Sequence, residues 1–291
     1  MAWNPTQIPD QTGRTFVITG ANGGLGAEIT RALAAKGATV LMACRNVAKA
    51  EPVAASIPGD VHVMQLDLAD LSSVRAFAEK AGEFDVLGNN AGLMYIPFTR
   101  TADGFETQFG VNHLGHFALT GLLLDRVRDR VVTLSSIAHL QTTKLRVDDL
   151  NYDRRRYSRS LAYSQSKLAN LMFARELRRR LAAAGSAVRS YAVHPGVSAT
   201  ELFARTETPL DVVMRPTMRL VGHSPAKAAH SPLFAATIPD ADPDTYWGPN
   251  WLFGSRGPVA PCPSTKLSKN KELQLALWTE SERMTGVTYR F

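Results

Sequence analysis

Short runs of apolar residues alternate, up to about residue 193, with stretches whose apolar positions recur every three to four residues. The runs are rich in β-branched residues and nearly continuous in apolar character, which is typical of strands buried on both faces of a sheet. The stretches between them have the period of amphipathic helices. This alternation predicts an α/β fold, a Rossmann-type doubly wound parallel sheet flanked by helices on both faces.

The expected elements begin and end where this pattern changes. We expect strands at 15–19, 39–43, 61–66, 84–87, 130–134 and 188–193. We expect helices at 25–36, 71–81, 103–125, 161–183, 225–236 and 269–284. Gly37 is placed to end the first helix, because glycine readily takes the left-handed conformation found there. We expect one domain over 1–291, with a substrate loop at about 198–225 and a C-terminal tail at about 237–291, irregular before its helix.

The composition limits the class of protein. No apolar run reaches about 18 residues and the N-terminus does not resemble a signal peptide, so we expect a soluble, cytoplasmic protein. The two cysteines, Cys44 and Cys262, are far apart and no HExxH pattern occurs, which predicts neither a disulfide framework nor a metal site. The net charge of +7 is scattered over short basic runs, so we expect no nucleic-acid partner. A basic surface would instead attract an anionic dinucleotide.

A glycine-rich turn joins the first expected strand to the first expected helix. Thr19-Gly20-Ala21-Asn22-Gly23-Gly24-Leu25-Gly26 has glycines that permit a tight turn and a close approach to a pyrophosphate. The helix that follows would direct free N–H groups and a partial positive charge at the phosphates. We expect the cofactor contacts in this turn to be Gly20, Asn22, Gly24, Leu25 and Gly26.

The end of the second strand bears on the choice of cofactor. An acidic residue there would bind the ribose 2′-hydroxyl of NAD, but the sequence has Arg45 instead. A guanidinium can hold a 2′-phosphate in a bidentate manner, which favours NADP(H) over NAD(H). The alternative interpretation is that Arg45 is simply a solvated loop residue.

Together these motifs resemble the short-chain dehydrogenase/reductase family over about residues 13–200, and most of all its retinol-dehydrogenase-like branch. The matching positions, all in the family's order, are the turn 19–26, Asp67, Asn89-Asn90-Ala91-Gly92, Asn112, Ser136, Tyr163 with Lys167, and Pro195-Gly196 with Thr200. Segments 43–45, 135–139, 163–170 and 194–197 carry the resemblance to the branch. The resemblance implies further cofactor contacts at Asp67, Leu68, Asn90, Ala91, Gly92, Tyr163, Lys167, Pro195, Gly196, Val197 and Thr200.

The chain departs from the family pattern at several points. Gly88 stands where a β-branched residue usually precedes Asn-Asn-Ala-Gly, and we expect it to loosen the fourth strand. The glycine turn has no basic residue, so only Arg45 favours NADP(H). The interval of 27 residues from Ser136 to Tyr163 is long, but the retinol-dehydrogenase-like branch has a similar insertion. We expect no counterpart here to the membrane anchors of animal retinol dehydrogenases.

Carbonyl reduction requires a hydride, a proton donor and a group that stabilises the developing oxyanion. Tyr163 and Lys167 are four residues apart and share one helix face. An ammonium at ~4 Å would contribute roughly 4 kcal/mol, enough to lower the pKa of the phenol by about three units. Ser136, at the end of the fifth strand, would donate to the substrate oxygen, with Ser135 as the competing candidate. The resemblance implies that Lys167 binds ribose hydroxyls and that Asn112 holds a water that relays protons to Lys167.

We therefore expect an NADP(H)-dependent oxidoreductase that interconverts an apolar alcohol and its aldehyde or ketone. The alternative is a catalytically idle cofactor-binding protein with a regulatory or interaction role on the same fold. Apolar residues of the substrate loop, Leu202, Phe203, Met214 and Met218, hint at a lipid-like substrate. The histidines at 113, 116 and 194 are expected to be packing residues, whereas His139 is a weaker candidate for the substrate pocket. The resemblance also implies that two copies pair through the long helix carrying Tyr163, which would give a homo-oligomer.

Overall fold

The computed structural model describes residues 2–196 and 224–291. Its centre is an eight-stranded sheet in the order β3-β2-β1-β4-β5-β6-β7-β8, in which every neighbouring pair is parallel except β7 and β8. The strand order reverses between β1 and β4, which is the point where ligands bind in doubly wound sheets. The strands are β1 (Thr15–Thr19), β2 (Thr39–Cys44), β3 (Asp60–Gln65), β4 (Phe84–Asn89), β5 (Val127–Leu134), β6 (Arg189–Val193), β7 (Trp247–Trp251) and β8 (Arg256–Pro261).

Helices cover both faces of the sheet. They are α1 (Gly24–Ala34), α2 (Val47–Ala55), α3 (Leu71–Lys80), α4 (Thr107–Phe109), α5 (Gly115–Leu123), α6 (Arg159–Ala183), α8 (Pro225–Ala228), α9 (His230–Thr237) and α10 (Lys271–Thr285). A π-helical turn, Gly110–Leu114, joins α4 to α5. Among the helices of the described ranges, none has both the length and the apolar character needed to cross a bilayer.

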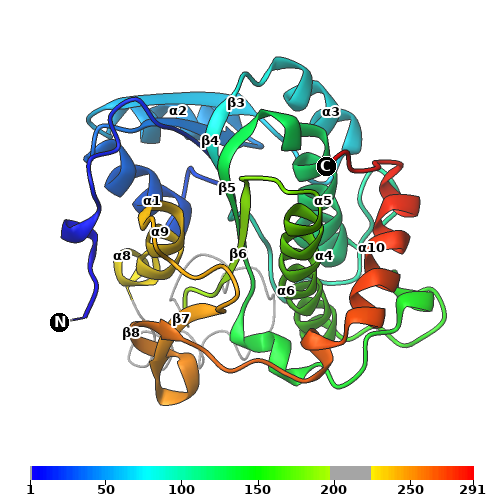
Figure 1. Cartoon of the computed structure of the whole chain (residues 1–291). Coiled ribbons are helices and arrows are strands. Elements are labelled where there is room, and N and C mark those ends of the chain that lie inside the picture. The colour runs from blue at the N-terminus through cyan, green and yellow to red at the C-terminus, as the bar shows by residue number, and fades with distance from the viewer. Residues whose placement is uncertain (1, 197–223) are drawn as a thin grey trace, which may run out of the picture.

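Two apolar layers hold the helices to the sheet. On one face α1, α2 and α9 pack against β1, β2 and β6 through residues such as Ile29, Leu33 and Leu233. On the other face α3, α5 and α6 pack on β1, β4 and β5 through residues such as Phe77 and Phe117. Figure 1 shows α1, α8 and α9 on one side of the strands and α4, α5 and α6 on the other, with α10 lying beyond α6.

The predicted fold class is confirmed, with corrections to several individual elements. The helix α2 was not expected, because Pro52 lies inside it and proline disfavours helix interiors. The strand β3 is not buried on both faces; as an edge strand it leaves Asp60, His62 and Gln65 exposed. The tail before α10 is not irregular, since β7 and β8 form an antiparallel pair there. The expected helix at 103–125 begins only at Thr107 and contains the π-helical turn.

Gly88 does not loosen β4, contrary to expectation. The strand continues through it to Asn89, and Gly88 pairs with Ile18 of β1 and with Val132 of β5. A Cβ at this position would lie 2.7 Å from Cδ1 of Ile18. Glycine therefore lets the neighbouring side chain fill the space beside the strand, and the sheet is closely packed here.

Candidate active site

The candidate site lies at the carboxyl edge of the sheet, where β1, β4 and β5 end. The glycine turn follows β1, Asn90 and its neighbours follow β4, and Ser135 and Ser136 follow β5. The parallel register brings these three segments to one edge, although they are far apart in the sequence. The buried part of α6 that carries Tyr163 and Lys167 faces the same edge, because Lys167 reaches the carbonyl of Leu134 at the end of β5.

The glycine turn forms a cradle that side chains would fill. Gly20 and Gly24 have φ values of +64° and +49°, in the left-handed region that glycine takes without strain. A Cβ on Gly26 would lie 2.3 Å from the carbonyl oxygen of Gly20. The N-cap of α1, Gly23, supplies no side-chain hydrogen bond. The first N–H groups of the helix are thus directed at the turn, as a pyrophosphate requires.

A hydrogen-bond network joins this turn to the segment after β4. The N–H groups of Asn90 and Ala91 each donate to Oγ1 of Thr19 at 2.9 Å. Nε2 of His116 lies 2.9 Å from the same Oγ1, and its Nδ1 lies 3.0 Å from the carbonyl oxygen of Asn112. A carbonyl can only accept, so Nδ1 carries the proton and Nε2 accepts from Thr19. Burial lowers the pKa of His116 to about 4, which keeps the ring neutral.

Asn90 also has an unused acceptor. Its Nδ2 donates to the carbonyl oxygen of Thr19 at 2.7 Å, whereas its Oδ1 is buried without a partner among the described residues. A buried acceptor left unpaired is costly, so it favours a ligand that donates a hydrogen bond, such as a ribose hydroxyl. Together with the glycine cradle, this donor and acceptor set fits a dinucleotide.

The predicted adenosine-side residues follow β2 and β3. Arg45 is exposed and forms no ion pair with any described residue. Asp67 accepts from the N–H of Ala69 at 2.9 Å, which fixes the turn after β3. Leu68 is buried, and its carbonyl oxygen would lie 2.5 Å from a Cβ on Gly115. The turn with Asp67 and Leu68 is therefore packed tightly against the start of α5.

Another group of predicted cofactor contacts follows β6. Pro195 and Gly196 come directly after this strand, and Gly196 has a φ of +82°. The N–H of Gly196 donates to Nδ1 of His194 at 3.3 Å. The remaining predicted contacts, Val197 and Thr200, lie outside the described residues, as does nearly all of the expected substrate loop with its four apolar side chains.

The structure brings Ser136, Tyr163 and Lys167 together. The hydroxyl of Ser136 lies near enough to the phenol of Tyr163 to lower its pKa. Nζ of Lys167 lies over the Tyr163 ring, 5.8 Å from its centroid, and donates to the carbonyl oxygen of Leu134 at 3.2 Å. A Cβ on Gly92 would lie 3.4 Å from that Nζ, so the segment after β4 closes directly over the ammonium.

The pKa of Tyr163 shifts in the direction opposite to the expected one. Burial raises it to about 12, and the nearby hydroxyl of Ser136 offsets this only in part. Burial also lowers the pKa of Lys167 to about 8. The expected Coulombic stabilisation of a tyrosinate assumed an ammonium near the phenol oxygen. In the folded chain the ammonium instead bonds to Leu134, and desolvation outweighs the attraction.

The two adjacent serines have different surroundings. Ser135 is buried, and its hydroxyl donates to the carbonyl oxygen of Lys167 at 2.7 Å, so it ties β5 to α6. Ser136 is half-buried and contacts the phenol of Tyr163. This geometry favours Ser136 over Ser135 as the residue that would face a substrate.

Asn112 lies in the π-helical turn, a feature often found at functional sites. Its Oδ1 accepts from the N–H of Leu93 at 2.9 Å. Its Nδ2 donates to the carbonyl oxygen of Leu93 at 3.0 Å and to Oγ of Ser166 at 2.9 Å. The amide is thus used to hold the loop after β4 against α6, a role that the resemblance did not imply.

The histidines pack in the interior. His113, His116 and His194 are buried, as predicted, and burial lowers their pKa values to about 3, 4 and 3. His139 is buried as well; its Nδ1 lies 2.7 Å from the carbonyl oxygen of Ser136, and its ring meets Tyr246 edge to face. His139 therefore helps to hold the backbone of Ser136 in place through its carbonyl oxygen.

One residue of the site was not found from the sequence. Tyr95 has its ring centroid 5.4 Å from that of Tyr163, at an interplanar angle of 80°. Nothing in the apolar pattern of 93–99 distinguishes it from a packing residue. The only available signal is its position, three residues beyond the glycine that ends Asn-Asn-Ala-Gly at the carboxyl edge of β4.

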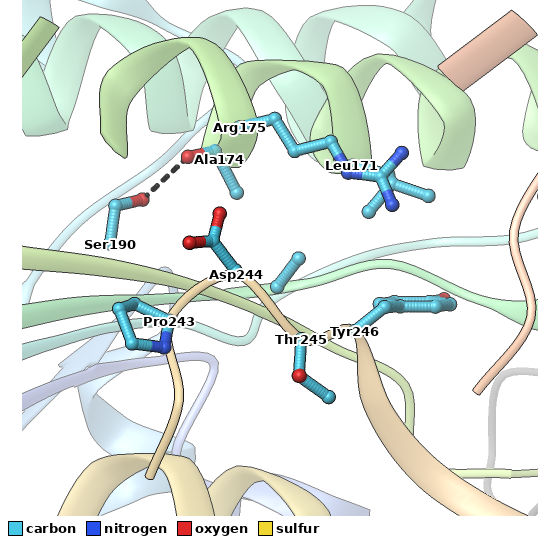
Figure 2. Close-up of a pocket in the computed structure, with 9 residues that line it drawn as sticks. Leu171, Ala174, Arg175, Ser190, Pro243, Asp244, Thr245 and Tyr246 are labelled. Carbon is cyan, nitrogen blue, oxygen red and sulfur yellow. Dashed lines mark hydrogen bonds between the residues drawn. The ribbon is translucent and has the colours of Figure 1, made fainter. Parts of the chain in front are cut away.

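A shallow hollow lies elsewhere, between α6 and the segment 243–246 (Figure 2). Arg175 enters from α6 and Asp244 from the opposite side, while Ser190 donates to the carbonyl oxygen of Ala174 at 2.9 Å. Among the described residues that line this hollow, none is a predicted catalytic or cofactor residue. The hollow is therefore separate from the candidate site.

A family model described as short chain dehydrogenase matches residues 14–147. The chain belongs to the short-chain dehydrogenase/reductase family.

Individual relatives confirm the resemblance to the retinol-dehydrogenase-like branch. Retinol dehydrogenase 12 of Mus musculus is 52% identical over 209 residues, which cover 67% of this chain and 64% of that protein. Retinol dehydrogenase 13 of Homo sapiens is 40% identical over 293 residues, which cover 94% of this chain and 85% of that protein. A crystal structure of an uncharacterized protein from Mycobacterium paratuberculosis has a TM-score of 0.88 at 46% identity and covers 100% of both chains.

Proposed function

We propose that this chain is an NADP(H)-dependent oxidoreductase that interconverts an apolar alcohol and its aldehyde or ketone. The observation that carries the proposal is the placement of Ser136 and Lys167 beside the phenol ring of Tyr163, at the sheet edge that also holds the glycine cradle. The names of the relatives, retinol dehydrogenases 12 and 13, support an apolar substrate. No observation favours a catalytically idle protein.

Each residue has a role that follows from its surroundings. A bound nicotinamide would supply or accept the hydride. Tyr163, whose pKa of about 12 keeps it protonated at neutral pH, would donate its proton to the carbonyl oxygen during reduction. The Ser136 hydroxyl would donate to the same oxygen as negative charge develops there. The Lys167 ammonium would hold ribose hydroxyls.

The cofactor and the location form part of the same proposal. Arg45 is exposed at the end of β2, where the 2′-position of an adenosine ribose would lie, and no described carboxylate neutralises it. It is therefore free to bind a 2′-phosphate in a bidentate manner. We expect NADP(H) to bind more tightly than NAD(H), and the protein to act in the cytoplasm on a small-molecule substrate.

The proposal is tested with a panel of apolar aldehydes, ketones and alcohols, assayed with NADPH and NADP⁺ by absorbance of the reduced nicotinamide. Tyr163→Phe is expected to lower kcat at least about hundredfold, since general acid catalysis contributes that much or more, while NADPH affinity stays within about twofold. Tyr191→Phe is the control, because it also removes a buried hydroxyl, one that donates to Ala241 far from the site. Near-full turnover by Tyr163→Phe would refute the mechanism.

A further inference from the structure

Two side chains clamp the loop that follows Asn-Asn-Ala-Gly. Asn112 holds both the N–H and the carbonyl of Leu93, at 2.9 and 3.0 Å. One helical turn earlier, Oε1 of Gln108 accepts from the N–H of Tyr95 at 2.7 Å. Three hydrogen bonds therefore fix the backbone of residues 93–95 to the helical segment that leads into α5.

Gln108 is itself held in place. Its Nε2 donates to the hydroxyl of Tyr157 at 2.7 Å and to the carbonyl oxygen of Arg159 at 2.9 Å. The hydroxyl of Tyr157 in turn donates to Oε1 of the buried Glu106 at 3.0 Å. The group that positions the N–H of Tyr95 thus belongs to a buried polar network, which leaves the loop little freedom to relax.

The clamped backbone holds Tyr95 in an unfavourable conformation. Its φ is +58°, in the left-handed region that glycine takes freely and bulky side chains avoid. Non-glycine residues held there cluster at ligand sites, where the surrounding structure maintains the strain. At Tyr95 the result is a half-buried ring set edge to face against the ring of Tyr163.

The neighbours of this ring belong to the candidate site. Met94, Ala138 and Tyr163 form one small apolar cluster with Tyr95 packed against it, and Ala138 lies two residues after Ser136. A carbonyl oxygen that reaches the hydroxyls of Ser136 and Tyr163 would place its adjoining carbon groups near the Tyr95 ring, because that ring packs against Tyr163. Those groups are the part of a substrate that the ring would contact.

We propose that Tyr95 is a specificity-determining residue whose ring forms the wall beside Tyr163 and limits the width of the group attached to the reacting carbonyl. This inference rests on the proposed oxidoreductase function. Slender unbranched chains pass the ring, whereas groups branched next to the carbonyl meet it. The residue contributes shape and apolar contact, and its hydroxyl is not required.

Three variants separate the ring, the hydroxyl and the backbone strain. Tyr95→Phe keeps the ring, Tyr95→Ala removes the ring but retains the strained φ, and Tyr95→Gly removes both. The assay measures kcat and KM with NADPH for octanal and for cyclohexanecarbaldehyde, together with the thermal midpoint of each variant. We expect Tyr95→Phe to keep the ratio of kcat/KM between the two aldehydes within about twofold of wild type.

The variants without the ring are expected to shift that ratio toward cyclohexanecarbaldehyde by about tenfold or more, the size of effect produced by small steric changes in apolar pockets. KM for octanal should rise more than kcat falls. Tyr95→Gly should melt no lower than Tyr95→Ala, because both lose the ring and only glycine relieves the strain. A purely structural role predicts instead that stability changes while the ratio does not.

The outcomes distinguish this inference from the function on which it rests. An active enzyme whose substrate ratio is unchanged in Tyr95→Gly overturns the role of Tyr95 and leaves the oxidoreductase function intact. Wild-type protein that turns over neither aldehyde nor any member of the wider panel, with either cofactor, overturns both. A clear change in the ratio of kcat/KM between the two aldehydes in Tyr95→Phe also overturns the inference, since the hydroxyl and not the ring then sets the preference.

Discussion

Replacing Gly26 by alanine tests whether the turn after β1 is shaped to receive a cofactor. The added Cβ would lie 2.3 Å from the carbonyl oxygen of Gly20, 2.8 Å from Cα of Ala21 and 2.8 Å from Nδ2 of Asn90. Comfortable contacts between such atoms are near ~3.5 Å, so the turn and the helix must separate by about 1 Å. Two of the three atoms belong to the backbone, which cannot move aside as the end of a flexible side chain can.

The expected magnitude follows from these contacts. Overpacking of this kind costs roughly 1–3 kcal/mol, and the better helix propensity of alanine offsets up to about 1 kcal/mol. A net loss of about 1–2 kcal/mol corresponds to a fall in Tm of roughly 2–8 °C in a domain of this size. Displacement of the N–H groups at the start of α1 should weaken NADPH and NADH alike, at least about tenfold.

The control is Gly23→Ala, three residues earlier in the same turn. Gly23 has an extended φ of −162°, and a Cβ there would meet nothing within 4 Å. The affinity of the Gly23→Ala variant for the cofactor should therefore stay within about twofold of wild type. Its free energy of unfolding should fall by less than about 1 kcal/mol, because alanine is a poorer N-cap than glycine. Titration of cofactor fluorescence and a thermal melt measure both quantities. If Gly26→Ala bound NADPH as well as Gly23→Ala does, the interpretation of the turn as a cradle would be refuted.

Three further predictions test the rest of the site. Ser136→Ala should lower kcat by roughly 10²–10³, whereas Ser135→Ala should mainly lower Tm. Steady-state kinetics and thermal melts of both variants test this, and a larger loss of kcat in Ser135→Ala would contradict it. Arg45→Asp should raise the Kd of NADPH much more than that of NADH in a fluorescence titration, and an equal rise for both would exclude phosphate recognition by Arg45. Burial lowers the pKa values of His113, His116 and His194 to about 3–4, below the ordinary value of 6.5, so the unfolded chain binds more protons as the pH falls below ~6.5. Tm should therefore decrease from about pH 7 to about pH 5, and a constant Tm over that interval would contradict neutral buried histidines.

The parallel part of the sheet could be predicted because its strands are continuous apolar runs, and the first strand was predicted with the observed bounds, Thr15–Thr19. The same reasoning missed β7 and β8, since residues such as Pro249 and Gly257 are typical of loops and their pairing depends on an edge provided by β6. Local pattern does not report such long-range pairing.

In the candidate site, too, part of the structure could be predicted from the sequence and part could not. Spacing placed Tyr163 and Lys167 on one helix face, but the pKa of Tyr163 depends on how completely α6 is covered, which only the tertiary structure reveals. The cover includes α10, whose Leu277 packs against Leu168 and Met172 of α6. The left-handed backbone of Tyr95 likewise has no signature in an apolar pattern, because hydrogen bonds from distant side chains impose it.

Both outer strands of the sheet are unsuited to recruiting another strand. At one edge β3 carries exposed polar groups, including Asp60 and His62, and Oδ1 of Asp60 lies 2.7 Å from Nε2 of His62. At the other edge β8 contains Pro258 and Pro261, which have no N–H to offer to a neighbour. Such features prevent edge-to-edge aggregation of exposed sheets. The described sheet should accordingly not extend from one copy of the protein to another at high concentration.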